Sequence, residues 1–170
     1  MPTDRDEEAR GLALMREAGD AIVAGVERLA AAWVVAAVGR VLDAWGGLDA
    51  PARARAVAEA EEAGRVGAAR VTGELRALLR RDPALQRETP LQVVRRLRHD
   101  VTAVLARAGV PEVERDEYER RSFPDDVYGV VPRSLADLGD DDLGPALLAW
   151  GAGKAIVVRA RGGPGRSGPG

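Results

Sequence analysis

The apolar positions of the first 45 residues recur at the spacing of an α-helix. Gaps of three and four residues separate the members of one stripe, which are Ile22, Val26, Leu29, Trp33, Ala37, Val41 and Ala44. Their mean spacing is close to 3.6 residues, so one face of a straight helix carries them all. Thr3 and Asp6 form a capping-box pattern that begins this helix, and Gly46-Gly47 ends it.

Residues 29–45 carry a second apolar stripe. Its members, which lie off the first face, are Val34, Val38, Leu42 and Trp45. A helix that is apolar on more than one face requires more than one neighbour. We therefore expect residues 29–45 to lie either at the centre of the fold or at an interface between two copies of a homo-oligomer.

A second helix is predicted from Asp49 to about Arg81. Asp49 is a suitable N-cap, and Pro51 is tolerated in the first turn. The core stripe includes small residues that allow close contact with the first helix: Val57, Ala60, Gly64, Ala68, Val71, Leu75 and Leu78. The short connection predicts an antiparallel hairpin over residues 3–81.

Two further helices are predicted in the C-terminal half. Thr89, Pro90 and Gln92 supply an N-cap, a first-turn proline and the third position of a capping box, and the apolar period continues to Gly109. A last helix over about 142–160 presents Leu143, Leu147, Trp150 and Val157. A short capped turn is expected between them, at residues 134–137.

The segment from 110 to 133 has no regular period, and it holds every tyrosine and phenylalanine of the chain. A connection this long within a domain is usually functional or packs on the core. Tyrosine and arginine on an exposed segment are residue types that dominate interface energies. The segment is therefore a lid, an interface or core packing, and its candidate partner-binding residues are Tyr118, Arg120, Arg121, Phe123 and Tyr128.

These elements predict an all-α fold. It consists of a long antiparallel hairpin (3–81), a C-terminal helical part (89–161) packed on it, and the irregular segment 110–133, in a single domain over residues 1–161. The abundance of alanine and the 4% aromatic content favour packed helices over a sheet. The Gly- and Pro-rich tail 162–170 is expected to be disordered.

Composition excludes several classes of function. The chain has no cysteine, which excludes disulfides, thiol catalysis and iron–sulfur clusters. Its N-terminus is acidic, unlike a signal or transit peptide. The longest uncharged run, 29–39, is shorter than the roughly 20 residues of a membrane span. We therefore expect a cytoplasmic protein without membrane contact.

Basic residues concentrate between positions 70 and 98, in a chain whose net charge is −2. Arginines on one surface could bind the phosphates of nucleic acid or a ribosome, although aromatic residues that would stack bases are absent there. The candidates are Arg76, Arg80, Arg81, Arg95 and Arg96. The alternative is that this block pairs with acidic residues of the same chain.

The candidates for catalysis fail on spacing or chemistry. His99 is the single histidine, too few for a metal phosphohydrolase, and Asp100 is placed for an ion pair with Arg96 on a solvated helix surface. The run around Lys154 lacks the first glycine and the hydroxyl residue of a phosphate loop. Asp140–Asp142 lack a closing glutamate for calcium and are expected to complement a helix dipole. No catalytic residue, metal or cofactor is expected.

Lys154 has an unexpected position, because it lies on the apolar stripe of the last helix, four residues after Trp150. Trp150 and Lys154 could bind an anion. Alternatively, the lysine stem covers apolar surface while its ammonium reaches an acid of residues 111–145.

Several short blocks resemble a family of uncharacterised actinobacterial proteins. They include Thr89-Pro-Leu91, Arg115-Asp-Glu-Tyr118, Arg121-Ser-Phe-Pro-Asp-Asp-Val-Tyr128 and Trp150-Gly-Ala-Gly-Lys-Ala155. The resemblance covers about residues 89–158. It implies a bacterial cytosolic protein and no assigned activity, so it transfers no catalytic residue.

The function expected from the sequence is a non-enzymatic helical adaptor or regulator that binds an unknown protein partner. Association with nucleic acid or ribosomes through the 70–98 surface is the alternative. A small-molecule site near Trp150 and Lys154 is a third possibility.

Overall fold

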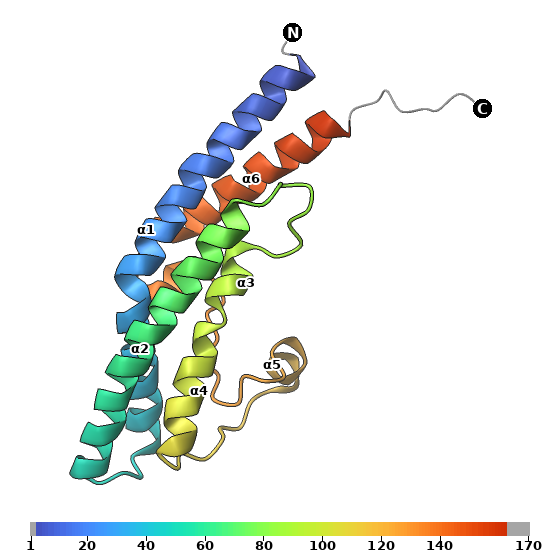
Figure 1. Cartoon of the computed structure of the whole chain (residues 1–170). Coiled ribbons are helices and arrows are strands. Elements are labelled where there is room, and N and C mark those ends of the chain that lie inside the picture. The colour runs from blue at the N-terminus through green and yellow to red at the C-terminus, as the bar shows by residue number, and fades with distance from the viewer. Residues whose placement is uncertain (1–2, 163–170) are drawn as a thin grey trace.

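The computed structural model describes residues 3–162, and the architecture of this part is all-α, without a β-strand (Figure 1). α1 (Asp4–Trp45) and α2 (Ala50–Leu79) form the predicted antiparallel hairpin. α6 (Leu143–Arg161) runs antiparallel along the N-terminal half of α1, and α4 (Leu97–Arg107) packs on α2 and on α1. The predicted fold class is confirmed.

Three shorter elements complete the fold. α3 (Pro90–Val94) packs on α2, and the short 3-10 helix η1 (Leu135–Leu138) lies between α6 and α1. α5 (Glu117–Ser122) stands away from the bundle (Figure 1). The expected disordered tail falls on residues 162–170, of which all but Gly162 lie outside the described residues.

The ends of the hairpin helices follow from their capping residues. The Thr3 side chain accepts from the Asp6 amide, and the Asp6 carboxylate accepts from the Thr3 amide. Gly46 ends α1 in the left-handed conformation, with φ 65°, which glycine adopts without a Cβ penalty. Asp49 then caps α2 by accepting from the Ala52 amide. These predicted boundaries are confirmed.

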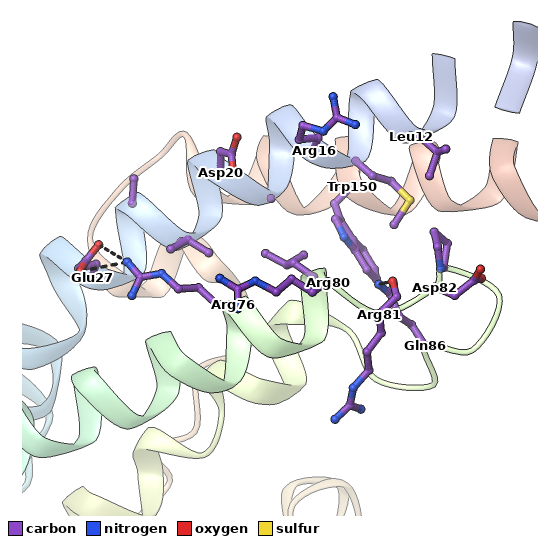
Figure 2. Close-up of a pocket in the computed structure, with 16 residues that line it drawn as sticks. Leu12, Arg16, Asp20, Glu27, Arg76, Arg80, Arg81, Asp82, Gln86 and Trp150 are labelled. Atoms are coloured by element: carbon purple, nitrogen blue, oxygen red, sulfur yellow. Dashed lines mark hydrogen bonds and ion pairs between the residues drawn. The ribbon is translucent and has the colours of Figure 1, made fainter. Parts of the chain in front are cut away.

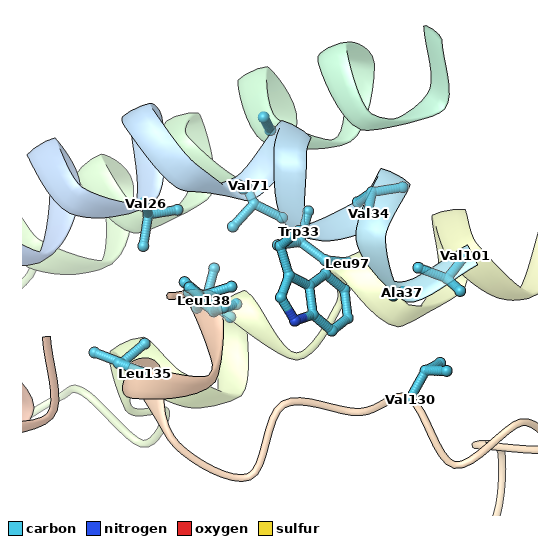
Figure 3. Close-up of a cluster of buried hydrophobic side chains, with 14 of the residues drawn as sticks. Val26, Trp33, Val34, Ala37, Val71, Leu97, Val101, Val130, Leu135 and Leu138 are labelled. Carbon is cyan, nitrogen blue, oxygen red and sulfur yellow. The ribbon is translucent and has the colours of Figure 1, made fainter. Parts of the chain in front are cut away.

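Most of both apolar stripes of α1 is buried within one chain. Trp33 and Ala37 of the first stripe are buried, and so are Val34, Val38 and Leu42 of the second, whereas Ala44 and Trp45 at the end of α1 are exposed. Figure 3 shows the Trp33 ring between the helices and the chain that carries Val130, Leu135 and Leu138. The C-terminal half thus supplies a second neighbour for this helix, and a homo-oligomer through residues 29–45 stays a prediction.

Small residues set the distances between α1 and its neighbours. A Cβ added at Gly64 of α2 would lie 2.7 Å from the carbonyl oxygen of Ala31. A Cβ at Gly153 of α6 would lie 2.8 Å from the carbonyl oxygen of Gly11. The backbones therefore meet directly at both crossings, as the small residues of the predicted second helix suggested.

The prediction of one continuous helix over 89–109 is wrong in one respect, because this segment forms two helices, α3 and α4. Arg96 and His99 donate their amides to carbonyls three residues earlier, on Val93 and Arg96, at 3.1 Å. This tighter turn interrupts the α-helical ladder. It lets Arg95 reach the main chain at Pro132, while Arg96 reaches acidic residues of α2 and of the loop before α3.

By length and composition alone, α1 is long and apolar enough to cross a membrane. The prediction that no segment reaches this length counted only strictly uncharged residues. In the fold, 44% of the most apolar stretch of α1 is buried against the rest of the chain, and a core helix passes the same test.

Candidate functional site

Residues 110–131 form an arm that leaves the end of α4 and returns toward η1. At its base, the Tyr128 hydroxyl donates to the Val110 carbonyl at 2.7 Å, and the Val113 amide donates to the Val127 carbonyl at 3.1 Å. Val110 and Tyr128 are both buried. The two limbs of the arm are therefore joined where they meet the bundle.

A buried carboxylate organises the returning limb. Asp126, with 2% of its surface exposed, accepts from the amides of Val130 at 3.0 Å and Val131 at 2.8 Å. Val130 and Val131 lie outside any helix or strand, so the Asp126 carboxylate supplies the acceptors that regular secondary structure would otherwise provide for their amides. The sequence analysis did not single out Asp126, because its acceptors serve amides four and five residues further on and no local capping pattern predicts them.

Arginine side chains join the two limbs of the arm to each other and join the arm to the bundle. The Arg115 guanidinium donates to the Phe123 carbonyl at 2.7 Å, and Arg95 of the turn before α4 lies over the Phe123 ring, 5.1 Å from its centre. Arg95 also donates to the Pro132 carbonyl at 3.0 Å. Arg98 of α4 pairs with the Asp125 carboxylate at 3.4 Å.

The tip of the arm is α5, none of whose residues is buried. Asp116 caps it by accepting from the Glu119 amide at 2.8 Å. Tyr118 is 75% exposed, and Arg120 makes no ion pair with any residue between 3 and 162. Arg121 pairs with Glu117 within α5. The arm thus presents a tyrosine and two arginines on a helix that is anchored at its base.

The five predicted partner-binding residues fall into two groups. Tyr118, Arg120 and Arg121 lie together on the exposed tip. Phe123 is half-buried, and Tyr128 is buried with its hydroxyl bonded to the main chain. The expectation that all three rings lie on an exposed segment is therefore wrong for Tyr128, because its ring closes the base of the arm.

The predicted arginine surface is largely occupied by contacts within the chain. Arg76 pairs with Glu27 at 3.1 Å, and Arg96 pairs with Glu74 at 2.5 Å and with Glu88. The Arg95 side chain contacts the Pro132 carbonyl and the Phe123 ring of the arm. Arg80, Arg81 and Arg95 make no ion pair within residues 3–162, and of these three only Arg95 donates to main-chain carbonyls.

The ion-pair partners of Asp100 and Arg96 differ from those that the sequence predicted. Asp100 pairs with Arg70 of α2 at 2.6 Å rather than with Arg96, because the turn before α4 directs Arg96 elsewhere. Burial raises the pKa of the Asp100 carboxyl above its usual value, and Arg70 opposes this shift. His99 is exposed, as predicted.

Lys154 does not pair with the acidic partner that the sequence predicted, and its anion-binding role stays a prediction. Its ammonium donates to the main-chain carbonyl of Gln86 at 2.5 Å and lies 5.4 Å from the centre of the Trp150 ring. The expected acid of residues 111–145 is not its partner, because α6 places Lys154 beside the loop between α2 and α3. Lys154 therefore fastens this loop to α6.

Gln86 is a further residue that the sequence did not single out. Its side-chain amide donates to the carbonyls of Leu78 at 3.0 Å and Arg81 at 2.9 Å. It thereby satisfies carbonyls at the C-terminal end of α2. No local sequence pattern predicts such a contact, because it depends on how the loop 82–89 folds back.

The described part of the chain contains no group of three or more His, Asp or Glu side chains placed to hold a metal ion. Comparison with protein-family models, with curated proteins and with solved structures finds no match, so the resemblance of residues 89–158 stays a prediction.

Proposed function

We propose that the protein is a non-enzymatic, cytoplasmic interaction protein whose arm binds a protein partner through α5. The observation that carries the proposal is the exposure of Tyr118 on a helix with no buried residue, held out by a bonded base. Tyrosine and arginine contribute more binding energy in interfaces than most residue types. An anchored arm also loses less conformational entropy on binding than a loose loop.

The charge of the tip favours a partner with an acidic or mixed surface. Glu117 neutralises Arg121, and Glu119 pairs with Arg133 behind the tip. Arg120 lies on a different face of α5 from Tyr118 and has no acidic partner among the described residues. One aromatic side chain with one free cation is a common arrangement for contacting a carboxylate-bearing surface.

The experiment is affinity purification of the whole chain from its native cytoplasm, comparing the wild type with Tyr118→Ala and Arg120→Ala. Leu148→Ala is the matched control, because Leu148 is 76% exposed on α6, far along the chain from the arm. We expect one partner to be lost, by roughly tenfold or more, in both tip variants and retained by the control. Identical partners in all four samples would contradict the proposal.

The alternative of nucleic-acid or ribosome binding has less support. Three of its five candidate arginines, Arg76, Arg95 and Arg96, already contact groups of the same chain. Phosphate binding would have to break these contacts, and it would weaken steeply with salt. Binding to ribosomes or to mixed RNA and DNA at low ionic strength tests this alternative, and undetectable binding there removes it.

A further inference from the structure

A pocket of about 700 Å³ lies between α1, the C-terminal end of α2, the loop 82–89 and α6 (Figure 2). Its wall is apolar where Leu12, Met15 and Val23 of α1 face Leu79 and Pro83. Pockets of about 300–1,000 Å³ with apolar walls and a few placed polar groups are typical of small-molecule sites. The arm lies outside this region and shares no lining residue with it.

Unpaired positive charge surrounds this pocket. Four arginines line it, but Arg76 is neutralised by Glu27 at 3.1 Å. Arg16, Arg80 and Arg81 make no ion pair with any carboxylate of residues 3–162 (Figure 2). All three come from different turns of α1 and α2 or from the chain just after α2.

The acidic residues of the lining do not neutralise these three arginines. Glu27 is paired with Arg76, and Asp82 is paired with Arg161 of α6 at 2.7 Å. Asp20, which is exposed, is the one remaining carboxylate of the lining. The lining therefore carries three guanidinium groups without an ion pair against one such carboxylate, and this charge balance favours an anion, although the three side chains point in different directions in Figure 2.

The wall also contains polar atoms without partners. Trp150, 2% exposed, has an indole N–H that no described residue accepts. Gln86, 5% exposed, uses its amide nitrogen on α2 while its amide oxygen accepts nothing from the described chain. Figure 2 shows both side chains together on one side of the pocket. Both atoms have almost no accessible surface, so a ligand in the pocket contacts these side chains without reaching the unpaired atoms.

We infer that this pocket binds an organic anion: an apolar body of ring or acyl-chain size that carries a carboxylate or phosphate group. The anionic group binds at the rim, where the exposed side chains of Arg16, Arg80 and Arg81 turn toward it from the different directions that Figure 2 shows, and the body lies on the apolar wall beside Trp150. Lys154 takes no part, because its ammonium is bonded to the main chain of Gln86. The inference is independent of the arm and of its partner.

The test uses anilinonaphthalene sulfonate, a fluorescent aromatic anion, and its neutral analogue phenylnaphthylamine. We expect the whole chain to bind one equivalent of the anion saturably. Substituting Arg16→Gln, Arg80→Gln and Arg81→Gln together should weaken anion binding roughly tenfold or more and leave binding of the neutral analogue unchanged. Arg55→Gln is the matched control, since Arg55 is an exposed arginine of α2 outside the pocket and should have no effect.

A second variant keeps the test decisive if the triple variant is poorly folded. Ala24→Trp places a large ring in the pocket from an exposed position of α1, so the fold, followed by circular dichroism, should persist. It should abolish binding of both probes. Decanoate and phenyl phosphate, added in turn to the wild type, distinguish a carboxylate from a phosphate ligand by which displaces the dye. Unchanged affinity in the triple variant, dye binding retained by Ala24→Trp, or displacement by neither competitor would overturn the inference.

Discussion

The Tyr128 hydroxyl and the Val110 carbonyl form a 2.7 Å hydrogen bond that joins the two ends of the arm. The residues are separated by the whole of α5, yet both are buried against the bundle. This single bond therefore closes a loop whose tip is the proposed binding surface.

Removing that hydroxyl should weaken the base without removing the ring. We expect Tyr128→Phe to lower the free energy of unfolding by about 1 kcal/mol, because the buried Val110 carbonyl loses its donor. Urea denaturation followed by circular dichroism measures the change. Tyr118→Phe is the control, since its exposed ring should leave stability unchanged.

Asp126 and Asp125 are adjacent but should respond differently to the same substitution. Asp126→Ala leaves the Val130 and Val131 amides without an acceptor and should cost about 2–3 kcal/mol. Asp125→Ala removes an ion pair at 3.4 Å in which the aspartate is exposed and Arg98 is mostly buried, and it should cost about 0.5–1 kcal/mol, less than Asp126→Ala. Equal effects in thermal denaturation would contradict the assigned role of Asp126.

Sequence periodicity was sufficient for the hairpin but not for the arm. Thr3, Gly46, Asp49 and Thr89 act locally, so their spacing predicted the helix ends. The positions of Tyr128 and Lys154 depend on residues far along the chain, on Val110 and Gln86. Sequence periodicity relates residues of the same helix, so it cannot predict contacts between distant segments. For the same reason the sequence suggested Trp150 and Lys154 as an anion site but did not suggest Arg16, which lies on α1.

The contact between Gly64 and Ala31 predicts opposite effects for two glycines of α2. Gly64→Ala should destabilise the fold by about 1–3 kcal/mol, because the new Cβ meets a backbone oxygen that can move only with its helix. Gly73 has no described atom within 4 Å of its Cβ position. Gly73→Ala should stabilise by about 0.5–1 kcal/mol through helix propensity. Calorimetry of both variants gives the comparison.

Thr72 carries a buried hydroxyl with no hydrogen-bond partner in the described part of the chain. Thr72→Val replaces this hydroxyl with a methyl of similar shape and should raise the free energy of unfolding by about 1 kcal/mol. Thr72→Ser keeps the hydroxyl and loses the methyl, so it should lower stability by about 1 kcal/mol. A destabilised valine variant would show that the hydroxyl is paired in solution.

Asp100 should give the wild type a distinct pH dependence. Burial raises its pKa in the folded state, so the folded protein holds the proton more tightly than the unfolded chain. The stabilisation that Asp100 contributes is fully present below its pKa in the unfolded chain and is lost as pH rises through its pKa in the folded protein. The stability of the wild type relative to Asp100→Asn should therefore increase from pH 7 to pH 4 in urea titrations, and a decrease would contradict the assignment.

The pairing of α1 with α6 has a consequence for biosynthesis. The N-terminal half of α1, including Gly11 and Met15, is covered by α6, which is translated long after it. Gly153 follows Gly11 by 142 residues, and ribosomes add about 5–20 residues per second, so this apolar surface waits roughly 7–30 s for its partner. During that interval the nascent chain presents a long apolar helix face to chaperones, and truncating the chain before α6 leaves that face permanently open.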